Sequence, residues 1–94
     1  MEMYVVCFDR LNPDADLTQF FQVLSKWWGK KMLDSVWVIT TGNETPRTIT
    51  DALLASCSRG SLRLFVTEVG LENWGGASLL IDPHEIGPNP LPPH

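Results

Sequence analysis

The sequence predicts an α+β fold in which two helices pack on one face of a mainly antiparallel sheet. The segment from Met3 to Asp9 is apolar at consecutive positions, as expected for a central strand covered on both sides. Two later segments have the periodicity of amphipathic helices, and segments with the composition of strands follow each of them. The predicted order of elements is therefore β-α-β-β-α-β.

The first strand carries apolar side chains on both of its faces. Alternation places Tyr4, Val6 and Phe8 on one face, and the other face holds Met3, Val5 and Cys7. Asp9 follows where the strand leaves the core, which is a common place for functional groups in folds that combine helices and strands.

The first helix is predicted over residues 17–28. Its N-cap is Asp14 or Asp16, and Asp16 with Gln19 resembles a capping box. Gly29 is the expected left-handed end of this helix. Its inner stripe consists of Leu17, Phe20, Phe21, Leu24, Trp27 and Trp28.

Residues 32–41 have the β-branched and aromatic composition of strands. We prefer a short strand that ends near Leu33, a tight turn, and a second strand from Val36 to Thr41; one long bent strand is the alternative. Trp37 alternates with valines, so we expect it to face the uncovered side of the sheet and to anchor a dimer.

The second helix is predicted from Thr45-Pro46 to about Ser58, because proline suits the first helical position. Gly60 is its expected left-handed stop. We expect its inner face to hold Ile49, Ala52, Leu53, Leu54 and Cys57.

The last predicted strand covers residues 61–69. Alternation places Leu62, Leu64 and Val66 on one face, and the opposite face carries Arg63, Phe65, Thr67 and Val69. Right-handed connections then place both helices on one side of the sheet, in a ferredoxin-like arrangement. The other side needs a second copy of the chain or the C-terminal segment as a cover.

The C-terminal part of the chain is predicted to lack a core of its own. Residues 77–81 are a candidate edge strand, either on this sheet or on that of a partner. One domain therefore covers residues 1–81. Residues 82–94 hold five of the seven prolines, so we expect a disordered or extended tail.

Composition limits the classes of function. Seven basic against eleven acidic residues give a formal charge of -4, which disfavours nonspecific binding of nucleic acid. Cys7 and Cys57 lie at apolar positions without metal-binding or redox spacing, which indicates free thiols. No apolar stretch approaches the roughly 20 residues that span a bilayer, so we expect a cytoplasmic protein without membrane association.

Short motifs in the three clearest strands resemble those of a known family. They are Tyr4 to Asp9 with the Leu-Asn-Pro that follows, Leu33 to Val38, and Leu62 to Val66. Together with the turn at 72–75 they resemble the SinR-like proteins, relatives of the small CRISPR-associated protein that joins the integrase in spacer acquisition. The likeness covers roughly residues 3–74.

The resemblance implies a ferredoxin-like homodimer with its sheets face to face, in nucleic-acid-linked defence or regulation. In the CRISPR-associated family, the aspartate at the position of Asp9 approaches its dimer mate and has been proposed to bind a divalent metal for phosphodiester cleavage. Ser35 and Trp37 match a serine-x-aromatic step of that family. This chain departs from the family after Asp9, where Arg10 is the one basic residue of a segment that usually carries several.

Two interpretations of Asp9 follow. As a catalytic residue it would hold Mg²⁺ with its copy in a second subunit, because magnesium needs few protein ligands. As a structural residue it would bond backbone N–H groups of the turn, and the residues alone favour this role. A small phosphate-binding patch is a further candidate, formed by Arg10 with Lys26, Lys30 and Lys31, although a solvated helix end is the simpler interpretation.

Two functional hypotheses remain. The resemblance favours a metal-dependent nuclease or its non-catalytic relative. The acidic composition and the single basic residue after Asp9 favour an interaction or regulatory module that does not bind nucleic acid and that contacts another protein.

Overall fold

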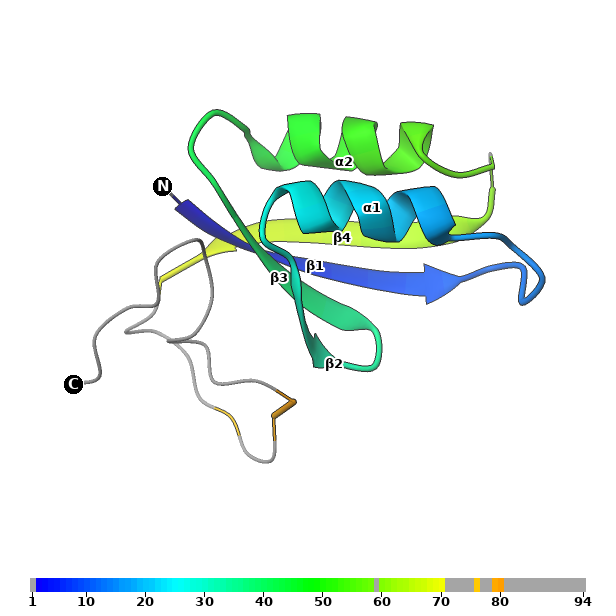
Figure 1. The fold of residues 1–94 in the computed structure, drawn as a ribbon, viewed down its shortest axis with the longest axis horizontal. Helices are drawn as coiled ribbons and strands as arrows, with labels where there is room; N and C mark the ends of the chain where they lie inside the picture. The colour runs from blue at the N-terminus through cyan, green and yellow to red at the C-terminus, as the bar shows by residue number, and fades with distance from the viewer. Residues whose placement is uncertain (1, 59, 71–75, 77–78, 81–94) are drawn as a thin grey trace.

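The computed structural model describes residues 2–58, 60–70, 76 and 79–80. The elements follow in the predicted order: β1 (Glu2–Arg10), α1 (Thr18–Lys26), β2 (Lys30–Leu33), β3 (Val36–Thr41), α2 (Pro46–Ala55) and β4 (Leu62–Val69). The strands form one sheet in the order β2-β3-β1-β4, and each neighbouring pair is antiparallel. Both helices lie over the same side of this sheet (Figure 1). The predicted α+β fold is confirmed, and the arrangement is consistent with a ferredoxin-like fold.

The core lies between the sheet and the two helices. β1 runs between β3 and β4, which confirms that it is a central strand. Tyr4, Val6 and Phe8 on its helix side are at most 7% exposed, whereas Met3, Val5 and Cys7 on its other side are partly buried. Aromatic packing joins β1 to α1, since the rings of Phe8 and Phe20 lie 5.0 Å apart. The fully buried side chains of this core are Val6, Phe20, Leu24, Ile39, Ile49 and Leu53.

Helix α1 is shorter than predicted, and its N-terminus is built differently. The capping box between Asp16 and Gln19 is wrong, because the N-cap position is Leu17 and no side chain caps it. Leu17 is 3% exposed, so its side chain serves the core. Asp16, one residue earlier, accepts hydrogen bonds from the backbone N–H and the hydroxyl of Thr18, at 2.9 and 2.7 Å.

The end of α1 also differs from the prediction. Trp28, rather than Gly29, has the positive φ of 54°. Gly29 donates its N–H to the Leu24 carbonyl at 2.9 Å, and a Cβ at this position would lie 2.6 Å from that oxygen. Gly29 is therefore required for close approach of the backbone. Trp28 is 42% exposed and does not continue the inner stripe, because the helix ends at Lys26.

The preferred prediction of two strands between the helices is confirmed. β2 and β3 are joined by a tight turn at Asp34 and Ser35, and the Phe8 N–H donates to the Ser35 carbonyl at 3.0 Å. This bond ties the turn to β1. The prediction that Trp37 faces the uncovered side is wrong, since its ring lies 5.5 Å from that of Phe21 on α1.

Helix α2 begins as predicted and ends earlier. Thr45 and Thr48 form a capping box, in which the side chain of each accepts from the backbone N–H of the other, at 3.2 and 2.8 Å. The helix ends at Ala55 rather than near Ser58, and Leu54 is 46% exposed, so its assignment to the inner face is wrong. Gly60 has the expected positive φ, 78°.

Two residues of the C-terminal segment lie against the sheet. The Leu80 N–H donates to the carbonyl of Met32 at 3.1 Å, at the free edge of β2. Leu79 packs with Met32 and Val38 on the side of the sheet that the helices leave open. The remainder of the candidate edge strand and the predicted tail at 82–94 lie outside the described residues. None of the described helices has the length and apolar character needed to cross a membrane.

Candidate functional site

The side of the sheet opposite the helices is the first candidate surface. We call it the open face. It carries apolar side chains from all four strands, and most of them are partly buried. Met32 and Val38 are buried, whereas 63% of the surface of Phe65 is exposed. The members described here are Met3, Val5, Cys7, Met32, Val36, Val38, Phe65 and Val69.

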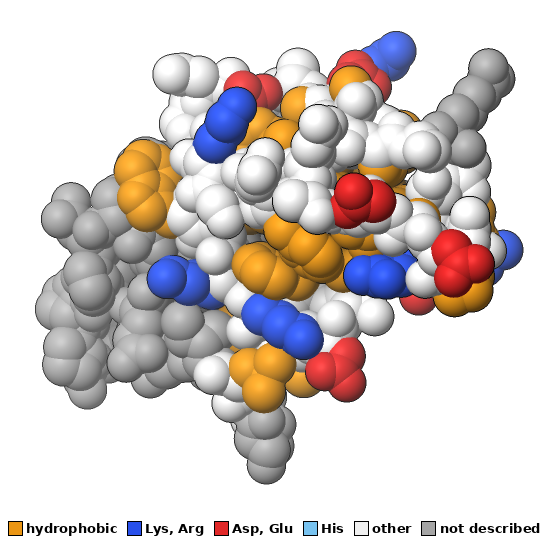
Figure 2. All heavy atoms as spheres, turned by 45° about the vertical axis from the view of Figure 1, so that its right-hand side comes forward, with side chains coloured by type: hydrophobic (Ala, Val, Ile, Leu, Met, Phe, Trp, Pro, Cys, Tyr) orange, Lys and Arg blue, Asp and Glu red, His pale blue; other side chains and the backbone are white. Residues whose placement is uncertain are grey.

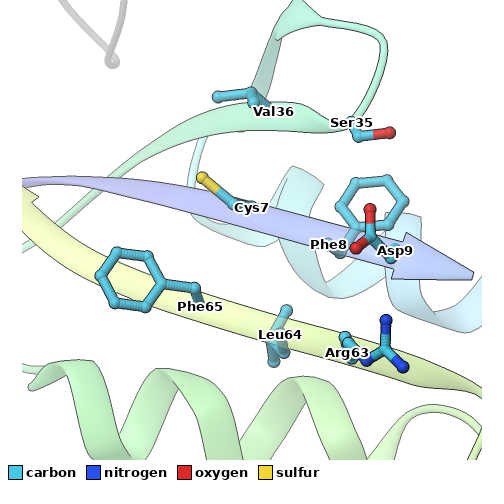
Figure 3. Close-up of a pocket in the computed structure, with 8 residues that line it drawn as sticks. All are labelled: Cys7, Phe8, Asp9, Ser35, Val36, Arg63, Leu64 and Phe65. Carbon is cyan, nitrogen blue, oxygen red and sulfur yellow. The ribbon is translucent and has the colours of Figure 1, made fainter.

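A hollow of 440 Å³ lies at one end of the open face. Figure 3 shows Cys7 and Asp9 on β1, Arg63 and Phe65 on β4, and Ser35 and Val36 at the start of β3 around it. Asp9 is directly opposite Arg63 in the pairing of β1 with β4, and Cys7 is opposite Phe65. One end of the hollow is thus charged and the other is apolar.

A second hollow of 600 Å³ lies around the end of β1 and shares four lining residues with the first, namely Phe8, Asp9, Ser35 and Arg63. Figure 2 views the side of the molecule where β1 ends, and basic and acidic side chains alternate there around a hydrophobic patch. The further lining residues are Arg10, Leu11, Phe21, Lys31 and Asp34. The end of β1 is therefore close to charge balance, with three cationic and two anionic side chains.

Asp9 and Arg63 are neighbours without being bonded to one another. Both are exposed, and their backbones are paired across the two strands. Among the described residues, the one ion pair within 4.0 Å joins Lys31 and Asp34, at 3.8 Å. Asp9 and Arg63 therefore keep hydrogen-bonding capacity for a ligand or a partner.

Cys7 lies in the apolar part of the first hollow. Burial raises the pKa of its thiol above the ordinary value, so the thiol is protonated at neutral pH. Burial likewise raises the pKa of Cys57. A protonated thiol is a weak nucleophile, and Cys7 is better described as part of the apolar lining.

The structure brings three of the four sequence-predicted site residues together. Asp9, Arg10 and Ser35 all line the second hollow. Trp37 lines neither hollow and instead supports the packing of α1 on the sheet. Its helix-side orientation follows from its register, because Trp37 is opposite Val6, which faces the core.

Sequence reasoning missed Arg63 and Phe65 as members of the site. The alternation of the last strand already placed both on the face opposite Leu62 and Leu64. The sequence did not give the register between the first and last strands, and this register places Arg63 opposite Asp9. In a sheet of this order β1 and β4 are antiparallel neighbours, so the end of the first strand meets the beginning of the last.

The donor set at Asp9 does not fit a magnesium site built by one chain. Its carboxylate has the guanidinium of Arg63 as the neighbouring charge across the strands, and a cationic side chain opposes a bound cation. Within residues 2–58, 60–70, 76 and 79–80, no three His, Cys, Asp or Glu side chains gather as a group that could hold a metal ion.

Comparison with known proteins adds no assignment. No protein-family model, curated protein or solved structure matches the chain. The candidate site is therefore interpreted from its own geometry.

Proposed function

We propose that this protein is a homodimeric interaction module, a non-catalytic relative of the small CRISPR-associated proteins it resembles, and that it pairs through the open face. The proposal is supported chiefly by Phe65, an aromatic side chain with 63% of its surface exposed beside an apolar hollow. Exposed aromatic side chains next to hollows are typical anchors of protein interfaces. A link to nucleic-acid-linked defence or regulation is part of the proposal and rests on the resemblance alone.

The charge of the chain supports this proposal, and its cysteines indicate the compartment in which we place it. The formal charge of -4 and the mixed charges around Asp9 give little attraction for a phosphate backbone. Two free cysteines are typical of a reducing compartment, so we place the protein in the cytoplasm. Pairing of the open faces would leave the helices of both copies available to another protein partner.

Substitution of Phe65 by Glu tests the dimer. We expect wild-type protein to be a dimer in sedimentation equilibrium, and Phe65→Glu to raise the dimer Kd by at least about thirtyfold, as for loss of an aromatic anchor. Leu54→Glu is the matched control, because Leu54 is 46% exposed on α2 and lies away from the open face. A wild-type monomer at concentrations up to about 1 mM would contradict the proposal, as would equal effects of the two substitutions.

A hydrolytic function is the second candidate, supported by the exposure of Asp9 at the rim of both hollows. It requires the Asp9 carboxylates of two chains, because one chain does not supply a fitting donor set. The test is an assay of wild type and Asp9→Asn on RNA and DNA with Mg²⁺ or Mn²⁺. Cleavage that Asp9→Asn abolishes would favour the nuclease, whereas equal cleavage by both proteins, or none by either, removes Asp9 as a metal-site residue.

A further inference from the structure

We infer that Asp9 of each copy forms an ion pair with Arg63 of the other copy, so that the two-fold axis of the dimer runs along β1 and β4, between them. This inference rests on the proposed homodimer. It assigns to Asp9 a different partner from a metal ion and makes Arg63 a determinant of how two copies recognise each other.

The described residues of the chain cover the open face unequally. On the side of β2 and β3, Leu79 packs on Met32 and Val38, and Leu80 bonds the edge of β2. On the side of β1 and β4 lie the hollow and the exposed Phe65. A second copy can therefore contact the exposed Phe65 over β1 and β4, and on this ground we place the centre of the interface between these strands.

The register then determines which side chains meet. Two sheets that pack face to face lie about 10 Å apart with their strands within about 30° of each other. A two-fold axis parallel to β1 and β4, midway between them, places each residue of β1 over the partner's copy of its own cross-strand neighbour. Asp9 thus meets the partner's Arg63, and Cys7 meets the partner's Phe65.

Both contacts are complementary. The carboxylate and the guanidinium keep free capacity, since no ion pair within 4.0 Å joins them in one chain. Two such pairs form per dimer, because a two-fold interface repeats each contact. The partner's Phe65 lies over the hollow that Cys7 lines, and an aromatic ring entering an apolar hollow supplies the anchor of the interface.

The alternative axis runs perpendicular to the strands and is less favourable. If it passes level with position 9, it places Asp9 over the partner's Asp9 and Arg63 over the partner's Arg63, and at any other level it leaves Asp9 away from both of these charges. Like charges that face each other across an interface are repulsive. The axis parallel to the strands avoids this repulsion, because it places opposite charges over each other.

A charge-swapped double variant, Asp9→Arg with Arg63→Asp, distinguishes the two axes. It keeps opposite charges at positions 9 and 63 within each chain, so we expect it to fold as wild type does by circular dichroism. We also expect its dimer Kd to lie within about threefold of the wild-type value. The decisive measurement mixes ¹⁵N-labelled double variant with unlabelled wild type at equal concentration, lets subunits exchange, and counts mixed dimers by native mass spectrometry.

With the inferred axis, mixed dimers contain two like-charge contacts, so their share falls from the statistical value of about half to below about one fifth. A share near half would overturn the inference, because the charges would then not meet. A share above half would overturn it in favour of Asp9 facing Asp9. If wild-type protein forms no dimers, the proposed function itself fails. This outcome differs from the other three, in which dimers form and only the share of mixed dimers varies.

A second measurement keeps the inference testable if the double variant does not fold. Asp9→Asn removes one charge from each of two attractive contacts, so we expect the dimer Kd in metal-free buffer to rise by about threefold to tenfold. Facing aspartates would instead give a lower Kd, and that result would overturn the inference. Asp51→Asn is the matched control, since Asp51 is an exposed acid on α2.

Discussion

At the scale of single residues, the interpretation of Asp9 depends on the charge of its cross-strand neighbour, Arg63. At the end of an apolar strand it resembles a functional carboxylate, and family likeness suggests a metal. Its cross-strand neighbour is Arg63, which opposes a cation and attracts another anion. In the proposed dimer, the same residue takes part in recognition of a second protein chain.

Gly29 gives the first prediction at this scale. A Cβ at this position would lie 2.6 Å from the Leu24 carbonyl oxygen, so Gly29→Ala forces the backbone of the turn after α1 to shift. We expect the free energy of unfolding in urea to fall by about 1–3 kcal/mol, as for other overpacking substitutions.

Gly60 provides the control for that prediction. Nothing lies within 4 Å of a Cβ built there, and its φ of 78° is a conformation that asparagine tolerates. Gly60→Asn should therefore change stability by less than Gly29→Ala. Equal losses in the two variants would show that close approach to Leu24 is not the reason for glycine at position 29.

At the scale of elements, the two helices begin in different ways. Helix α2 has a reciprocal capping box between Thr45 and Thr48. Helix α1 places the buried Leu17 at its N-cap position and depends on Asp16, one residue earlier. In α1, the N-cap position is also a core position. Leucine occupies it and is buried, so no side chain caps the helix there.

This difference predicts a pH dependence for α1. Hydrogen bonds from the hydroxyl of Thr18, and then from its backbone N–H, lower the pKa of Asp16 below its ordinary value of 3.8. A lowered pKa in the folded state means that the stabilisation is complete above about pH 4 and is lost as the pH falls through the lower, folded value. Asp16→Asn should therefore lower Tm at pH 7 and lose this effect near pH 2.

Asp14→Asn is the control for Asp16, because it removes the same charge two residues earlier. In the described part of the chain, the Asp14 carboxylate accepts no hydrogen bond from α1. Asp14→Asn should therefore lower Tm at pH 7 by less than Asp16→Asn does. Equal losses of Tm in the two variants at pH 7 would contradict the assigned role of Thr18.

At the scale of the whole molecule, the open face is shared between the chain and its proposed partner. The helices cover one side of the sheet (Figure 1). On the other side, Leu79 packs against Met32 and the Leu80 N–H bonds the Met32 carbonyl of β2. The half over β1 and β4 keeps its exposed aromatic side chain. This division is what centres the proposed interface on Asp9, Arg63 and Phe65.

The cover over β2 and β3 yields a prediction of its own. Leu79 packs on Met32 and Val38, so Leu79→Ser should lower the free energy of unfolding in urea by about 1 kcal/mol through loss of apolar contact. Leu80→Ser is the control, because the Leu80 side chain is 61% exposed and its bond to Met32 uses the backbone. Losses of the same size in both variants would mean that the contact of Leu79 contributes nothing specific.

The order and type of the elements were predicted from the sequence, with one alternative left open, a single bent strand in place of β2 and β3. Alternation identified the two faces of β1, and helical spacing identified the inner faces of α1 and α2, because burial imposes a period on each kind of element. Local signals were less secure at the ends. The N-cap of α1, its left-handed Trp28 and the exposed Leu54 depended on packing between elements, which local spacing does not record.

Only the tertiary structure decided the composition of the candidate site. The direction in which Trp37 points depends on its register with Val6, and the pairing of Asp9 with Arg63 joins residues more than fifty positions apart. A strand of alternating side chains does not specify which residues of another strand lie opposite it. Register is set by how the whole sheet closes over its core, so the neighbours of Asp9 became known only once the fold was assembled.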